Sequence, residues 1–145
     1  MQIQRIQSVY IFLAIVMLAI FAIVPFGEVV SLEGQAVGTP DPLYVMENPG
    51  ILIPTGAIIL LLLVALFMFR NLRAQQGMMV FTLFLTLSLI AVVCWTLYKE
   101  AGAEGMDAHF SWWDILLPVA AFLEILAIGG IKHDAKLLKS LDRIR

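Results

Sequence analysis

The residue with the clearest chemical implication is Glu124, an acid in the middle of an apolar stretch near the carboxy terminus. A charged carboxylate at the centre of a bilayer costs about 2.5–3.5 kcal/mol on insertion scales, so we expect its side chain to face protein or water. Helical spacing places Thr82 and Thr86 on one face of the preceding apolar stretch, with Thr86 at the depth of Glu124 if the two helices run antiparallel. We therefore predict that Glu124 is a neutral acid, hydrogen-bonded to this threonine stripe and above all to Thr86.

Two roles are open for such a residue. A protonated, hydrogen-bonded Glu124 that specifies which helices pair is a structural group, whereas a proton or cation relay through it is a functional one. A relay normally needs a chain of ionisable groups, and the apolar stretches contain no second charged residue. The sequence therefore favours the structural role, and a Glu124→Gln substitution separates the two.

A second set of residues is basic and indicates anion binding. At 100° per residue, four of the cations in segment 132–145 form one stripe, and three leucines and Ile144 lie on the opposite face. The four are Lys132, Lys136, Lys139 and Arg143. This pattern predicts a basic amphipathic helix that either continues the fourth apolar helix or lies flat beside anionic headgroups. Asp142 and Arg143 are placed to pair with arginines elsewhere on this side. The candidate interaction residues of this side are Arg5, Arg70, Arg73, Lys132, Lys136, Lys139, Asp142 and Arg143.

The other reactive residue types lack the spacing of a catalytic or metal site. His109 lies in an acidic segment without the ligand spacing of a known metal site, which favours a solvated loop. Cys94 is the only cysteine, and we expect it to be an apolar filler rather than a reactive thiol. The chain has no GxSxG, HExxH, CxxC, GxGxxG or P-loop motif. We therefore expect no catalytic residue, no metal and no cofactor.

These residues belong to a chain whose composition is that of a membrane protein. Of its 145 residues, 61% are hydrophobic and 14% are charged, against about 45–50% and 25% in a soluble domain. This balance excludes a cytosolic enzyme, a disordered chain and a nucleic-acid binder. Stretches long enough to cross the hydrocarbon core as helices occupy about residues 8–26, 51–69, 78–98 and 115–131. The predicted fold is a single-domain, all-α integral membrane protein with an antiparallel four-helix bundle.

The first stretch has a second interpretation as a cleaved signal peptide. Its apolar run is long for such a peptide, and no clear small-residue cleavage site precedes Pro25. We therefore favour a retained membrane helix.

The distribution of charge predicts the orientation of the chain. Eight of the nine Lys and Arg residues lie on one side of the predicted spans, and only Lys99 lies on the other. Eight of the eleven Asp and Glu residues lie on the side of Lys99. By the positive-inside rule, both termini are then cytoplasmic.

The connections between the predicted spans differ in character. The cytoplasmic turn 70–77 is tight, so the second and third helices should pack as an antiparallel pair. The outer connection 27–50 has room for a short hairpin with strands at 28–32 and 35–37, followed by irregular loop at 38–42. The outer connection 99–114 is expected to be a solvated loop, and 132–145 is the cytoplasmic tail.

Three segments together resemble a known family. They are MQIQRIQS at residues 1–8, RNLRAQ at residues 70–75 and IKHDAKLLKSLDRIR at residues 131–145. The likeness is to the small four-span bacterial membrane proteins called domain of unknown function 4293, and it extends over the whole chain. It implies a bacterial inner-membrane protein without an assigned activity, substrate or catalytic residue. The chain has Ala135 where the family pattern favours an acid.

Two functional interpretations follow. The favoured one is a non-enzymatic accessory or scaffold subunit, whose partner is a membrane protein, a second copy of the chain or the anionic lipid surface, and not a nucleic acid. The alternative is a small transporter or channel component that uses Glu124 as a proton or cation site. A lipid-modifying enzyme is disfavoured because no catalytic set is present.

Overall fold

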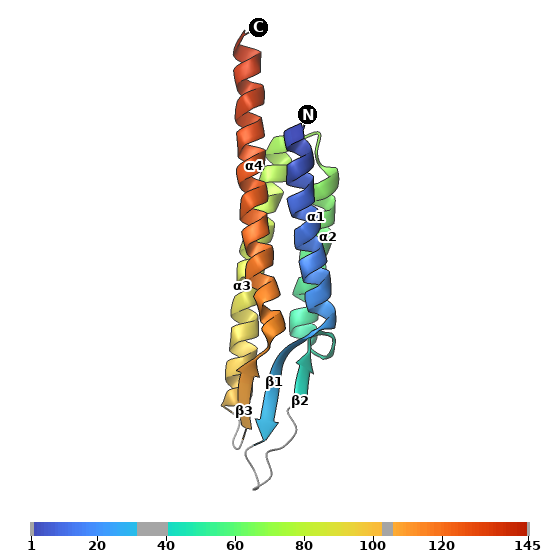
Figure 1. Ribbon diagram of the computed structural model, residues 1–145, viewed down its shortest axis with the longest axis vertical. Coiled ribbons are helices and arrows are strands. Elements are labelled where there is room, and N and C mark those ends of the chain that lie inside the picture. The colour runs from blue at the N-terminus through green and yellow to red at the C-terminus, as the bar shows by residue number, and fades with distance from the viewer. Residues whose placement is uncertain (1, 32–40, 103–105, 145) are drawn as a thin grey trace.

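The protein is built mainly from four long helices that lie side by side (Figure 1). The computed structural model describes residues 2–31, 41–102 and 106–144 of the chain. The helices are α1 (Gln2–Ile23), α2 (Pro49–Phe67), α3 (Leu72–Ala101) and α4 (Leu116–Ile144). The chain passes along the long axis of the molecule four times, so that consecutive helices run in opposite directions. Among the described residues, α1 packs on α2 and α4, and α3 packs on α2 and α4.

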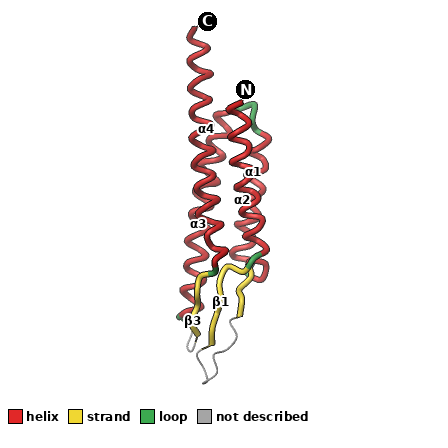
Figure 2. The backbone as a smooth tube through the Cα atoms, viewed as in Figure 1, coloured by secondary structure: helices red, strands yellow, loops and turns green. Residues whose placement is uncertain are grey.

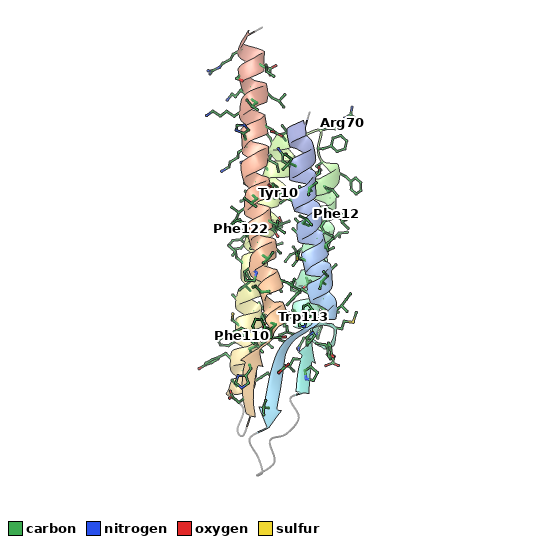
Figure 3. All side chains as sticks on the ribbon, in the orientation of Figure 1. Tyr10, Phe12, Arg70, Phe110, Trp113 and Phe122 are labelled. Carbon is green, nitrogen blue, oxygen red and sulfur yellow. The ribbon has the colours of Figure 1, made fainter. Side chains whose placement is uncertain are left out.

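All four helices are long and apolar enough to cross a membrane. About 20 helical residues span the 30 Å hydrocarbon core, and the shortest of the four has 19. Large apolar side chains cover the outside of the helices: Phe12 and Phe122 project away from them (Figure 3) and are 56% and 59% exposed. Such a surface needs lipid as its solvent, which makes the chain a multi-pass membrane protein.

The turn between α2 and α3 is shorter than the sequence predicted. The helix α3 begins at Leu72, not near residue 78, because the Asn71 side chain caps it by accepting a hydrogen bond from the Ala74 N–H at 3.3 Å. The extra helical turn places Gln75 against α2, where its Nε2 donates to the carbonyl of Ala65 at 3.0 Å. The expected connection 70–77 is therefore reduced to residues 68–71.

The core lies between the helices and follows a spacing of three and four residues on each of them. This spacing keeps one stripe of a helix facing its neighbours. On α1 the buried stripe is Gln7, Ile11, Ala14, Leu18 and Phe21. On α4 it is Leu117, Ala120, Glu124, Ala127, Ile131 and Asp134. Both stripes are mainly apolar, so the few polar members mark the places where helices exchange hydrogen bonds.

The expectation of an all-α protein is wrong at one end of the molecule. A three-stranded antiparallel sheet covers that end, which we call the sheet end (Figure 2). Its strands are β1 (Pro25–Ser31), β2 (Asp41–Tyr44) and β3 (Met106–Phe110), in the order β2-β1-β3. The opposite end, where α1 begins and α4 ends, is called the terminal end.

The sheet corrects both predicted outer connections. The predicted strand 28–32 overlaps β1, which begins earlier, at Pro25. Its hairpin partner is β2, which begins in a segment that was predicted to be irregular loop up to residue 42. The predicted strand at 35–37 lies outside the described residues. The connection 99–114, predicted to be a solvated loop, contributes β3, which pairs with β1 from Gly27 opposite Phe110 to Ser31 opposite Met106. Pairing between segments far apart in the chain leaves no local signal in a strand this short.

The sheet lies close against α3 because of Gly27. A Cβ atom at this position would collide with Leu97 Cδ2 and lie 3.3 Å from the carbonyl oxygen of His109. The absence of a side chain at Gly27 thus lets the central strand approach α3 directly.

Candidate functional site

The first candidate site is the buried acid on α4. Thr86 Oγ1 lies 2.7 Å from Glu124 Oε1, so the predicted hydrogen bond between α3 and α4 is confirmed. The same Oγ1 lies 3.0 Å from the backbone carbonyl of Thr82. A hydroxyl carries one hydrogen and can donate it to only one of these two oxygens. A neutral Glu124 that donates to Thr86, while Thr86 donates to the Thr82 carbonyl, satisfies both short distances.

The surroundings of Glu124 are closed and apolar. The side chain has no exposed surface, and neither have Ala120 and Ala127 on the adjacent turns of α4. Thr82 shares the stripe of Thr86, but its own hydroxyl donates to the carbonyl of Met79 at 2.9 Å. Small residues on both sides of the acid let α3 approach α4 closely. This arrangement fits a group that holds two helices in register.

A second layer of buried polar side chains lies nearer the terminal end, and sequence reasoning missed it. Gln7 Nε2 on α1 donates to Asp134 Oδ2 on α4. Gln7, Gln75 and Asp134 are only 3%, 2% and 6% exposed. Asp134 was predicted only to belong to the cytoplasmic tail 132–145. The signal that could have found it is its helical spacing from Glu124, Ala127 and Ile131, which places all four residues along one face of α4.

The two polar layers are separated by apolar packing. The helix rises about 15 Å between Glu124 and Asp134. The gap is filled by Ala127 and Ile131 of α4 and Met79 of α3, all without exposed surface. The interior of the protein thus contains two acids on one face of one helix, with apolar side chains between them.

Gly130 makes room for the Gln7 side chain. A Cβ atom at Gly130 would lie 2.9 Å from Gln7 Cγ, whereas one at the neighbouring Gly129 would meet nothing within 4 Å. A glycine at position 130 therefore permits the contact between α1 and α4 that the Gln7–Asp134 hydrogen bond requires.

The second candidate site is a cleft of about 480 Å³ at the terminal end, between the α2–α3 turn and the last turns of α4. It brings together five of the eight residues that the sequence singled out on this side. The residues that line it are Arg70, Asn71, Leu72, Arg73, Gln76, Ala135, Lys136, Leu138, Lys139 and Asp142. We call it the basic cleft.

The other three predicted residues do not line the basic cleft. Lys132 and Arg143 are exposed elsewhere on α4, and the side chain of Arg5 lies outside the described residues. The predicted ion pairs of the tail with Arg70 and Arg73 are wrong, because neither Asp142 nor Arg143 forms a salt bridge with them within the described part of the chain. A pair with Arg5 falls outside the described side chains. The tail is not stapled beneath the helices, because α4 continues straight past them (Figure 1).

The sheet end holds the remaining polar residues of interest. His109 Nε2 lies 3.4 Å from Asp107 Oδ2 on β3, and both side chains are exposed. Within the part of the chain that the structure describes, no group of three or more potential metal ligands comes together. Trp113 (Figure 3) lies in the short 3-10 helix Trp112–Ile115 that precedes α4, and the Ser111 N–H closes this turn by donating to Asp114 Oδ2 at 3.1 Å.

A comparison with family models gives a match over residues 3–144, which includes all four helices and the sheet. The chain belongs to the family named domain of unknown function DUF4293. The comparison with curated proteins gives no match. In this DUF4293 protein, the basic cleft and both polar layers lie within the matched region.

The close contact at Gly130 can be tested with a matched pair of substitutions. We expect Gly130→Val to destabilise the protein by about 1–3 kcal/mol, because the new side chain displaces Gln7 from Asp134. Gly129→Val adds the same atoms to open space and should change stability by less than about 0.5 kcal/mol. The free energy of unfolding of both variants is measured in mixed detergent micelles. An equal loss of stability in the two variants would contradict the proposed contact between Gly130 and Gln7.

Proposed function

We propose that this DUF4293 protein is a non-enzymatic accessory or scaffold subunit of the bacterial inner membrane. In this proposal the four helices cross the bilayer as an antiparallel bundle with the terminal end in the cytoplasm. The asymmetry of charge supports this orientation, because eight of the nine Lys and Arg residues of the sequence belong to segments 1–8, 70–77 and 132–145, and the positive-inside rule assigns such segments to the cytoplasm.

The observation that carries the proposal is the extension of α4 past the other three helices (Figures 1 and 2). After Ala135 all of its described side chains are exposed. Leu137 and Leu141, one turn apart, are 41% and 60% exposed, and the cations of the basic stripe lie on another face. Exposed leucines on a helix that leaves the membrane are typical of a surface that another helix covers. The partner is a second membrane protein or a second copy of this chain.

The extension can be tested by its effect on a complex. We expect the full-length protein, purified from bacterial membranes in a mild detergent, to elute above the mass of a monomer with its partner bound. The double variant Leu137→Ser/Leu141→Ser should elute as a monomer. Its control, Lys132→Ser/Arg143→Ser, changes two residues on the basic face and should keep the complex. A wild-type protein that elutes as a bare monomer would overturn the accessory function.

The orientation has its own test, which uses the single cysteine of the chain. In a Cys94→Ser background, Glu47→Cys introduces a thiol at the sheet end and Ser140→Cys introduces one on the extension. A membrane-impermeant maleimide added to spheroplasts should label the first variant and not the second. Permeabilised membranes should give labelling of both. The reverse pattern in spheroplasts would place the termini outside.

A proton relay through Glu124 is the second candidate function, and the buried Asp134 favours it. The sequence argument against a relay was the lack of a second acid, and the structure supplies one on the same face of α4. The apolar side chains between them weigh against the relay, because proton transfer needs a continuous chain of polar groups or water. We therefore retain the structural role for Glu124 in the main proposal.

A Glu124→Gln substitution distinguishes the two roles. The amide that it introduces can still donate a hydrogen bond to Thr86 Oγ1, but it cannot take up or release a proton at neutral pH. We expect unchanged thermal stability, and no proton flux above that of empty liposomes in either protein, measured with an internal pH-sensitive dye under an imposed potassium diffusion potential. A flux in the wild type that Glu124→Gln abolishes would establish the relay instead.

A further inference from the structure

The basic cleft gathers cations from two separate elements without a matching number of acids. Arg70 and Arg73 come from the α2–α3 turn and the first turn of α3, and Lys136 and Lys139 come from α4. Asp142 is the only acid among the lining residues, and none of these cations forms a salt bridge within the described part of the chain. Like charges that gather around one cleft repel, so an anion bound in the cleft would relieve that repulsion.

We propose that the basic cleft binds the phosphate group of an anionic phospholipid from the cytoplasmic leaflet. This inference rests on the orientation given under the proposed function, because only that orientation places the cleft against this leaflet. Guanidinium groups bind phosphate oxygens through two parallel hydrogen bonds, and ammonium groups add point charges. The amides of Asn71 and Gln76 in the lining supply neutral hydrogen-bonding groups beside the four cations.

The depth of the cleft favours a lipid over a soluble anion. Phe67 and Phe69, immediately before Arg70, are 73% and 55% exposed and therefore belong to the hydrocarbon or its boundary. Arg70 follows in the α2–α3 turn, and its side chain lies at the terminal end on the side away from α4 (Figure 3). The apolar side chains of Leu72 and Leu138 line the same cleft. A ligand here would thus contact cations with its headgroup and apolar side chains with its glycerol and acyl regions.

Two cations of the same helix lie outside the cleft and provide a control. Lys132 and Arg143 are exposed and belong to the basic stripe of α4, but neither lines the cleft. A general attraction to a charged membrane would depend on the number of charges and not on their position. If the basic cleft is a specific binding site, its affinity for the lipid depends on Arg70 and Arg73 far more than on Lys132 and Arg143.

Titration of the full-length protein with lipid in a mild detergent tests the proposal. The probes are dioleoyl phosphatidylglycerol and the zwitterionic dioleoyl phosphatidylcholine, and bound lipid is counted by native mass spectrometry. We expect a saturable site for phosphatidylglycerol. Since each basic residue contributes about 1 kcal/mol near an anionic surface, Arg70→Gln/Arg73→Gln should weaken this site by about tenfold or more. Lys132→Gln/Arg143→Gln, with the same change in net charge, should weaken it by less than about threefold, because these groups do not contact the phosphate.

Several outcomes would overturn the proposal. They are the absence of a saturable site in the wild type, equal binding of phosphatidylcholine, and equal losses in the two double variants. Displacement of the lipid by millimolar inorganic phosphate would assign the cleft to a soluble anion instead. Thermal unfolding checks that the arginine variant is folded, and Lys136→Gln/Lys139→Gln provides a second variant on the opposite wall with the same expected loss. Because the titration uses isolated protein, its result is independent of the partner and orientation tests.

Discussion

The structure depends on one constraint: a polar group placed between helices in hydrocarbon has no water to bind and must find its partner inside the protein. The buried amide and carboxyl side chains meet this requirement in part: one polar atom of each bonds across a helix pair, while Gln75 Oε1, Glu124 Oε2 and Asp134 Oδ1 have no partner among the described residues. Thr86 and Glu124 join α3 to α4, Gln7 and Asp134 join α1 to α4, and Gln75 joins α3 to the Ala65 carbonyl of α2. Apolar packing between helices has little preference for one register over another in lipid, whereas these hydrogen bonds form in only one. They therefore determine which helix faces meet.

The helix ends are connected differently at the two ends of the molecule. At the sheet end, β1 follows α1, β2 leads to α2 and β3 lies between α3 and α4, so the three strands join the ends of all four helices. At the terminal end, only α4 continues beyond the others (Figure 1). The sheet end is thus closed by backbone hydrogen bonds, and the terminal end exposes side chains. An interaction surface on the second end is consistent with this division.

Glu124 and the basic cleft illustrate two uses of charge in one membrane protein. Glu124 lies where a charge is costly, and a neutral carboxyl group fits the hydrogen bonds that link its Oε1 through Thr86 to the Thr82 carbonyl. The cations of the cleft lie where charge is favourable, and they have few acids beside them. The hydrogen bond of Glu124 holds two helices together. The unpaired cations of the cleft can attract an anionic ligand.

The sequence by itself determined the four apolar helices, the side on which the cations gather and the bond between Glu124 and Thr86, because helical periodicity and depth in the membrane are local or nearly local properties. Only the tertiary structure decided the sheet, the burial of Asp134 and the basic cleft. The strand Met106–Phe110 pairs with Pro25–Ser31, and Gln7 meets Asp134 from the other end of the chain. Arg70 and Lys136 share a cleft only because α4 runs straight past the α2–α3 turn. Each of these features depends on a contact between distant segments, and the energy of such a contact belongs to the pair and not to either segment alone.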